Sequence, residues 1–331
     1  MSVLKPGKLP ADMLRRLLAV GHTPPELLLP PMVGEDACAI AIQDGVLIAA
    51  TDPITLTGQE IGGHAVVINA NDVAVTGVRP RWFMATILLP PGSTEAAVEA
   101  LFADMRQALE RHRVALVGGH TEITSAVTQP VVVGQMLAFQ ANGHFIRTGG
   151  LSDGDIVLQI GPAPIEAAAV LANERGSSLK SLPVDVLMQA RQAAEDPGIS
   201  VVETALLAAA LGASALHDPT EGGLSAGLHE LADASGVALR VDRSAVLWFE
   251  PGKIACELLD GDPWGALASG TLLAGFAEAQ VDQAEKALDA VGHLSARIGR
   301  AHPGCGVHDT AGTELVRYEQ DEVSRILADP G

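Results

Sequence analysis

Basic and aromatic residues are scarce in this sequence of 331 residues. It has 21 lysines and arginines against 40 aspartates and glutamates, a formal net charge of −19, and only 3% aromatic residues. Nucleic-acid-binding surfaces need basic patches for the phosphates, and single strands are commonly held by stacked aromatic side chains. The composition therefore argues against nucleic acid as a partner. It leaves nucleotides open, because divalent cations bridge carboxylates to phosphates.

Long apolar runs and clustered cysteines are also missing. Hydrophobic residues make up 48% of the chain, yet no stretch approaches the roughly 18 apolar residues that indicate a membrane span. The first twenty residues lack the apolar core and the small-residue cleavage site of a signal peptide. Cys38, Cys256 and Cys305 are widely spaced and form no disulfide or zinc pattern. We expect a cytoplasmic protein without a membrane segment.

Hydrophobic periodicity predicts an α+β order in the first half. Residues 37–50 form two short strands around the turn Gln43–Gly45, a turn follows over 51–58, and the apolar pattern of residues 94–113 predicts an amphipathic helix. The remaining predicted elements are a helix over about 60–77 and strands over 82–89, 114–118 and 130–139.

The composition of the sequence changes near residues 148–152, where glycine and aspartate cluster. We place a domain boundary there, which gives domains 1–148 and 149–331. The second half is predicted to contain helices over 164–175, 183–195 and 200–212 and a strand over 237–241.

Acidic residues recur beside the predicted strands. Glu35 and Asp36 precede one strand and Asp52 ends the next, while the later acidic positions are Asp72, Glu122 and Asp218. Carboxylates that converge from strand ends can hold magnesium, which takes oxygen ligands and keeps positions for phosphate.

Glycine pairs accompany the acidic residues. Gly118-Gly119 precedes His120 and Thr121, and Gly222-Gly223 follows Asp218. Such pairs allow a close approach of the backbone, whose N–H groups can bind phosphate oxygens. Lys8 is a candidate cation for a nucleotide phosphate.

Each of these residues also has a purely structural interpretation. Asp52 before Pro53 can cap a turn, and glycine pairs are common in turns. His120 can be structural, Glu122 can be a solvated acid, and Cys305 an inert thiol. Taken singly, none of them establishes a site.

The predicted helix over 60–77 carries polar residues among apolar ones. Ala65, Asn69, Asp72 and Thr76 fall on one stripe at helical spacing, and the rest of the surface is mainly apolar. A narrow polar stripe of this kind indicates a helix in a core that faces a polar site. We predict Asp72 as a metal ligand and Asn69 as a supporting hydrogen-bond partner, with Asn71 rotated off the stripe.

The motifs together, in this order, resemble the superfamily of aminoimidazole ribonucleotide synthetase, selenophosphate synthetase, thiamine-monophosphate kinase and the hydrogenase-maturation carbamoyl dehydratase. The resemblance covers nearly the whole chain and is strongest to relatives of the hydrogenase-maturation branch. The motifs that carry it are Gly34-Glu35-Asp36-Ala37, Thr51-Asp52, Asn71-Asp72 with Gly77 and Pro80, Gly118-Gly119-His120-Thr121, Gly154-Asp155 and Asp218-Pro219-Thr220-Glu221-Gly222-Gly223-Leu224.

The resemblance implies a specific architecture and chemistry. It implies a ferredoxin-like half-barrel domain at the N-terminus, which pairs across a homodimer and binds ATP and Mg²⁺, and a C-terminal α/β sandwich domain on the substrate side. With the candidates already named, the predicted metal ligands are Glu35, Asp36, Asp52, Asp72, Glu122 and Asp218. The predicted nucleotide contacts are Lys8, Thr51, Asn71, Gly118, Gly119, His120 and Thr121.

Three departures from the family limit what can be carried over. The hydrogenase-maturation protein works through a C-terminal cysteine, and the end of this sequence, "SRILADPG", has none. His120 stands where an acid is usual, and no reactive cysteine of the selenophosphate type is found near the N-terminus.

The leading functional hypothesis is an ATP- and Mg²⁺-dependent enzyme that activates a small substrate by phosphorylation. Two alternatives stay open. One is a nucleotide-binding maturation partner without turnover of its own, and the other is a phosphotransferase like thiamine-monophosphate kinase.

Overall fold

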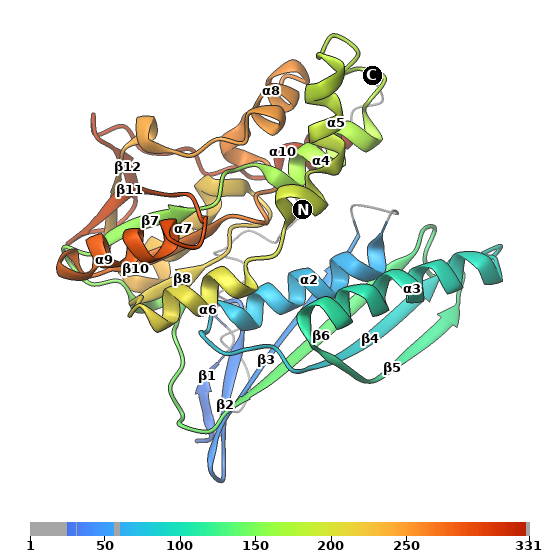
Figure 1. Ribbon diagram of the computed structural model, residues 1–331, viewed down its shortest axis with the longest axis horizontal. Coiled ribbons are helices and arrows are strands. Elements are labelled where there is room, and N and C mark those ends of the chain that lie inside the picture. Colours follow the sequence, from blue (N-terminus) through green and yellow to red (C-terminus); the bar gives the residue numbers. More distant parts are fainter. Residues whose placement is uncertain (1–24, 31, 56–59, 329–331) are drawn as a thin grey trace, which may run out of the picture. The chain divides into compact units, whose positions relative to one another are not determined.

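The computed structural model of the protein describes residues 25–30, 32–55 and 60–328. These residues form two compact units (Figure 1). The first holds residues 25–30 and 36–145, and the second holds 32–35 and 146–328.

The first unit is a six-stranded sheet with two helices. The strand order is β1-β2-β3-β6-β4-β5, and α2 and α3 lie along the sheet (Figure 1). All neighbouring strands are antiparallel except the parallel pair β4 and β5. The elements are β1 (Leu27–Leu29), β2 (Cys38–Ile42), β3 (Gly45–Ile54), α2 (Ile61–Ala74), β4 (Trp82–Leu89), α3 (Glu95–His112), β5 (Ala115–Ile123) and β6 (Val131–Gln140).

Alternating burial explains how this sheet and its helices pack. In β4 every second residue is buried, from Phe83 to Leu89, as expected for a strand with one face against a core. Helix α3 begins after Thr94, whose hydroxyl accepts a hydrogen bond from the Ala97 N–H at 3.2 Å. The helix ends at His112, and the next residue, Arg113, caps it with a positive φ. The predicted strand 82–89 and helix 94–113 are confirmed.

Two strands run further than the sequence predicts. Strand β3 continues through Asp52 and Pro53 to Ile54, where a turn was expected, because these residues pair with β6. Proline is tolerated there because β2 pairs with β3 only as far as Ala49. Strand β5 likewise continues through the glycine pair to Ile123 because it pairs with β4. Pairing with the neighbouring strands therefore outweighs the local preference of these residues for turns.

The second unit is built on another six-stranded sheet, of order β12-β9-β11-β7-β10-β8, in which only β12 and β9 are parallel. Its centre is apolar, since every residue of β7 and β10 is buried. The strands are β7 (Ile156–Ile160), β8 (Ala215–His217), β9 (Ala238–Val241), β10 (Leu272–Phe276), β11 (Ser295–His302) and β12 (Val307–Asp309). The helices are α4 (Ile165–Glu174), α5 (Val184–Gln192), α6 (Val202–Ala210), α7 (Gly223–Ser235), α8 (Glu250–Leu258), α9 (Glu278–Asp289) and α10 (Glu322–Ala328).

The second unit confirms the helices predicted near 164–175, 183–195 and 200–212 and the strand near 237–241. The two mixed sheets with their helices confirm the α+β class. In the part of the chain that the structure describes, no helix combines the length and the hydropathy needed to cross a bilayer.

Candidate active site

The best-defined polar contact of the first unit joins helix α2 to strand β3. The Asn69 side chain accepts a hydrogen bond from the Asp52 N–H at 2.8 Å and donates one to the Asp52 carbonyl at 3.2 Å. Its amide also donates to the Ala65 carbonyl at 2.9 Å, and Asn69 is fully buried. Asp52 lies beyond the end of β2, so Asn69 takes the place of a neighbouring strand. The structure thus contains a hydrogen bond from Asn69, as predicted, and its supporting role at a cation site stays a prediction.

A glycine of β6 makes room for this contact. Gly134 is the register partner of Asp52, and a Cβ on it would lie 2.3 Å from the Asn69 amide nitrogen. The Gly134 carbonyl accepts a hydrogen bond from the Thr51 hydroxyl at 2.7 Å. The contact therefore depends on three elements, α2, β3 and β6, and it fixes the backbone of the Thr51-Asp52 motif.

Burial of polar residues on α2 extends beyond the polar stripe that the sequence predicts. Asn71 is as fully buried as Asn69, and Asp72 is 6% exposed, so burial also covers the residue predicted to lie off the stripe. The helix ends at Ala74, so the part of the prediction that placed Thr76 in the helix is wrong. Thr76 lies in the following turn, where its hydroxyl donates to the Val73 carbonyl at 2.6 Å, and Gly77 has a φ of 76°.

The predicted motif Gly118-Gly119-His120-Thr121 lies on β5, which is exposed along its entire length. Gly119 is required there, because a Cβ on it would lie 2.3 Å from the Ala85 carbonyl oxygen. The His120 imidazole and the Glu122 carboxylate are exposed and 3.2 Å apart. The glycine pair is thus part of a strand, and the expected phosphate-binding turn is absent at residues 118–119.

A hollow of about 220 Å³ adjoins this strand. Its apolar wall comes from Phe102 and Met105 of α3 and Ile87 of β4, while His120 and Thr121 supply polar groups. Gly118 and Gly119 line it through their backbone. Four of the predicted nucleotide contacts, Gly118, Gly119, His120 and Thr121, therefore meet at one concave surface of the first unit.

Glu35 of the second unit has a set of donors around its carboxylate. One oxygen accepts from the Arg147 guanidinium at 2.9 and 3.1 Å, and the other accepts from the Thr148 N–H at 3.2 Å. The Gly149 N–H lies 3.4 Å from the first oxygen, and the side chain is 3% exposed. These contacts tie residue 35 to the start of the second unit.

The loop between β8 and α7 carries Asp218, which is 2% exposed. The preceding residue, His217, is bonded through Nε2 to the Glu230 carboxylate at 2.9 Å. The N–H of Gly222 donates to the Asp321 carboxylate at 2.8 Å, and that of Gly223 donates to the Thr220 carbonyl at 3.0 Å. Both glycine amides already have acceptors inside the protein, so the phosphate contact expected at this pair is not supported.

Sequence reasoning missed Asp321 and Glu230. The pattern of an aspartate directly before a helix does identify Asp321 as an N-cap of α10, since it accepts the Val323 N–H at 2.8 Å. Its bond to Gly222, 99 positions earlier, has no sequence signal. Burial raises the pKa of the Asp321 carboxyl to about 7.

The predicted metal ligands are divided between the two units. Asp36, Asp52, Asp72 and Glu122 belong to the first, and Glu35 and Asp218 to the second. Within the described ranges, no group of three or more histidine, cysteine, aspartate and glutamate side chains is arranged to hold a metal. Magnesium bound with a nucleotide needs only one or two carboxylates, because phosphates and water complete its shell. Lys8 lies outside the described residues.

Comparison with known proteins identifies both halves of the chain. Residues 34–139 match the family "AIR synthase related protein, N-terminal domain", and residues 152–310 match the corresponding C-terminal domain. The carbamoyl dehydratase HypE of Cupriavidus necator is 30% identical over 280 residues, which are 80% of this chain and 76% of the relative.

Two solved structures have the same fold. A hydrogenase maturation protein HypE in complex with ATP has a TM-score of 0.71 at 23% identity, over 89% of this chain and 92% of the other. HypE in a HypE–HypF complex has a TM-score of 0.72 at 22% identity, over 86% and 94% of the two chains.

Proposed function

Because the chain belongs to the AIR synthase related family, in its hydrogenase-maturation branch, we propose that it is an ATP- and Mg²⁺-dependent enzyme that activates a small substrate by phosphorylation. The observation that carries this proposal is the contact between Asn69 and the backbone of Asp52, which fixes a family motif. Asp72, on the same helix as Asn69, is also buried. The ATP complex of a HypE with the same fold supports the nucleotide.

The residues of this chain would divide the work as follows. Asp36, Asp52 and Asp72 supply carboxylates to the cation, and Asn69 keeps the backbone of Asp52 in place. The nucleotide would contact Thr51 and Asn71. It would also contact the hollow beside β5, which is lined by Gly118, Gly119, His120 and Thr121. Magnesium, when bound, neutralises the charge on the phosphates. Glu122 and Asp218 are secondary candidates for the cation, and the donors around Glu35 support a structural role there.

The two predicted domains receive different roles in this proposal. Residues 1–148 bind the nucleotide and form the homodimer, and residues 149–331 face the substrate. The exposed edge strand β5 supports the dimer, because an unpaired edge with exposed Leu116, Val117 and Ile123 is a ready surface for a second copy. Val117→Lys should convert the dimer into a monomer in light scattering; a wild-type monomer would contradict this part. The proposed location is the cytoplasm.

The proposed activity is tested by ATP binding and turnover. Wild-type protein should bind ATP in the presence of Mg²⁺ in equilibrium dialysis, and Asp52→Ala and Asp72→Ala should each weaken that binding at least tenfold. Asp44→Ala, in the exposed hairpin of the same unit, is the matched control and should bind like wild type. Release of phosphate is then measured against a panel of small carboxamides, carboxylates and phosphate monoesters, including thiamine monophosphate. Failure of the wild type to bind Mg²⁺ and ATP would overturn the proposal.

A second candidate function is a nucleotide-binding maturation factor that acts only within a protein complex. The HypE–HypF complex, which has the same fold in its HypE part, favours it. This candidate predicts ATP binding without phosphate release for every small acceptor, and turnover only when a purified partner protein is added.

A further inference from the structure

The hollow beside β5 lies between that strand, β4 and helix α3, all within the first unit. Figure 1 shows β5 at the edge of the sheet. Gly119 of β5 pairs in register with the buried Ala85 of β4, and Thr121 pairs with the buried Ile87 two residues later. All four residues line the hollow. Because Gly119 has no side chain, the space between β5 and α3 stays open at this point.

The walls and the size of the hollow suit a flat, apolar ring. The aromatic ring of Phe102 and the thioether of Met105 form the wall on the side of α3. Aromatic side chains stack on nucleobases of every kind, because each base has a π-face. The volume of about 220 Å³ is below the roughly 300–1,000 Å³ of sites that enclose a drug-sized ligand. A nucleotide is therefore too large to be enclosed whole, so its base can enter while its phosphates remain outside.

Helix α3 places a cation at the border of the hollow. Arg106 follows Phe102 by four residues, about one helical turn, so the two residues lie on the same side of the helix. Long side chains on a helix lean toward its N-terminal end and cover the preceding turn. The Arg106 guanidinium is therefore expected to lie over the turn that carries Phe102. Arg106 is exposed, so a ligand can reach it from solvent.

No carboxylate of the protein occupies this guanidinium. In the part of the chain that the structure describes, Arg106 makes no hydrogen bond and no ion pair, even with Glu110 one turn further along the helix. Arg147 and Arg300, in contrast, are each paired with a glutamate. The N–H donors of Arg106 are thus open to an external anion, and a guanidinium binds phosphate oxygens in a bidentate way.

We propose that Arg106 binds the phosphates of the nucleotide, whose base occupies the hollow against Phe102. This inference rests on the proposed function and deepens it, because it adds a phosphate contact that none of the family motifs contains. Both residues belong to one helix of the first unit, so the assignment needs no contribution from the second unit.

A comparison of ATP with adenosine tests the two parts of this assignment, by equilibrium dialysis with labelled ligands and saturating Mg²⁺. Arg106→Gln should weaken ATP binding at least fivefold and leave adenosine binding unchanged, because adenosine has no phosphate. Arg106→Lys, which keeps the charge, should lose less ATP affinity than Arg106→Gln. Phe102→Leu should weaken ATP and adenosine by the same factor, at least threefold, because the base loses its aromatic partner.

Arg111→Gln is the matched control. Arg111 is another exposed arginine of α3 without a hydrogen bond or ion pair among the described residues. It follows Phe102 by nine residues, about two and a half turns, and therefore lies on the opposite side of the helix. Arg111→Gln should bind both ligands like wild type, and all variants should keep native far-ultraviolet circular dichroism.

The phosphate contact is overturned by equal ATP affinity in wild type and Arg106→Gln. Equal losses of ATP and adenosine affinity in this variant would also overturn it, because they would show a change in the hollow itself. Unchanged affinities in Phe102→Leu, or no adenosine binding by wild type, would overturn the placement of the base. If wild type binds ATP and these variants bind it equally well, the proposed function stands and only this assignment fails. If wild type binds no ATP with Mg²⁺, both fail.

Discussion

The two units fix their motif residues in similar ways but over different distances along the chain. In the first, the buried amide of Asn69 holds the backbone of Asp52, only 17 positions away. In the second, the buried carboxylate of Asp321 holds the backbone of Gly222, 99 positions away. In both, a polar side chain inside the protein satisfies a backbone group of a loop or strand end. The side chains that matter most for placing a motif therefore lie outside it.

The largest expected effect comes from removing the nearer contact. Asn69→Ala deletes three hydrogen bonds and leaves the N–H and carbonyl of Asp52 without this partner. We expect the free energy of unfolding to fall by about 3 kcal/mol, since each buried polar group left unpaired costs roughly 1–3 kcal/mol. Urea denaturation measures the change. Asn142→Ala, in an exposed turn of the same unit, should cost less than about 1 kcal/mol.

The next effect sharpens the geometry of the same contact. Gly134→Ala places a methyl group against the Asn69 amide and should destabilise the protein by about 2 kcal/mol, as overpacking usually does. In a double-mutant cycle, Asn69→Ala should recover part of this loss, because it removes one of the two clashing groups. The Phe83 ring, 2.8 Å from the same Cβ position, prevents full recovery. Additive losses would show that the two residues do not interact.

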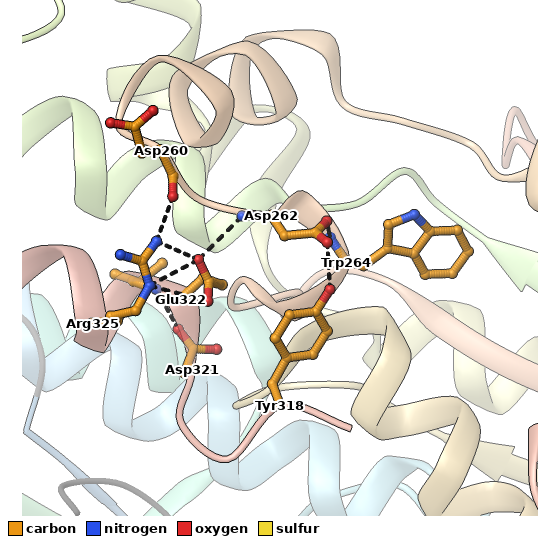
Figure 2. Close-up of polar contacts among 8 residues, drawn as sticks. Asp260, Asp262, Trp264, Tyr318, Asp321, Glu322 and Arg325 are labelled. Carbon is orange, nitrogen blue, oxygen red and sulfur yellow. Dashed lines mark hydrogen bonds and ion pairs between the residues drawn. The ribbon is translucent and has the colours of Figure 1, made fainter. Parts of the chain in front are cut away.

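A smaller effect concerns Asp321 (Figure 2), which holds the Gly222 N–H: its contribution to the free energy of unfolding should depend on pH. Burial raises the pKa of Asp321 to about 7 in the folded protein, above its ordinary value of 3.8. A raised pKa contributes stability below the unfolded pKa, and this contribution is lost as pH rises through the folded pKa. From pH 6 to pH 8 we expect the free energy of unfolding of the second unit to fall by about 1.4 kcal/mol because of this group.

Asp321→Asn should remove this part of the pH dependence, which denaturant titrations at each pH can measure. The same variant should leave the pH dependence of the first unit unchanged, because Asn69 and the backbone of Asp52 do not titrate. Equal pH profiles for wild type and Asp321→Asn would contradict the assignment.

The contrast also explains what the sequence predicts and what it does not. The helical spacing of Asn69 and Asp72 was enough to predict that both lie buried on one helix, with Asn69 as a hydrogen-bond partner, because a helix has a fixed period. The extensions of β3 past Asp52 and of β5 past Gly119 were not predictable from local patterns. They arise from pairing with β6 and β4, and Asp-Pro and Gly-Gly sequences by themselves favour turns.

The bond from Asp321 to Gly222 was beyond sequence reasoning for a related reason. The N-cap pattern at Asp321 is local. The hydrogen bond from the Gly222 N–H to the Asp321 carboxylate depends instead on tertiary packing between parts of the chain that are far apart in sequence. Likewise, the donors around Glu35 come from residues 147–149, which no spacing rule connects to it.

The most direct test of the account is a magnesium titration of ATP binding by isothermal calorimetry, with wild-type protein, Asp52→Asn and Asp44→Asn. The account predicts that ATP affinity in the wild type rises at least tenfold between Mg²⁺-free and Mg²⁺-saturated conditions. It predicts that Asp52→Asn loses most of this rise and that Asp44→Asn keeps it. Equal magnesium dependence in all three proteins would contradict the claim that the Asn69 contact holds Asp52 at a magnesium–nucleotide site.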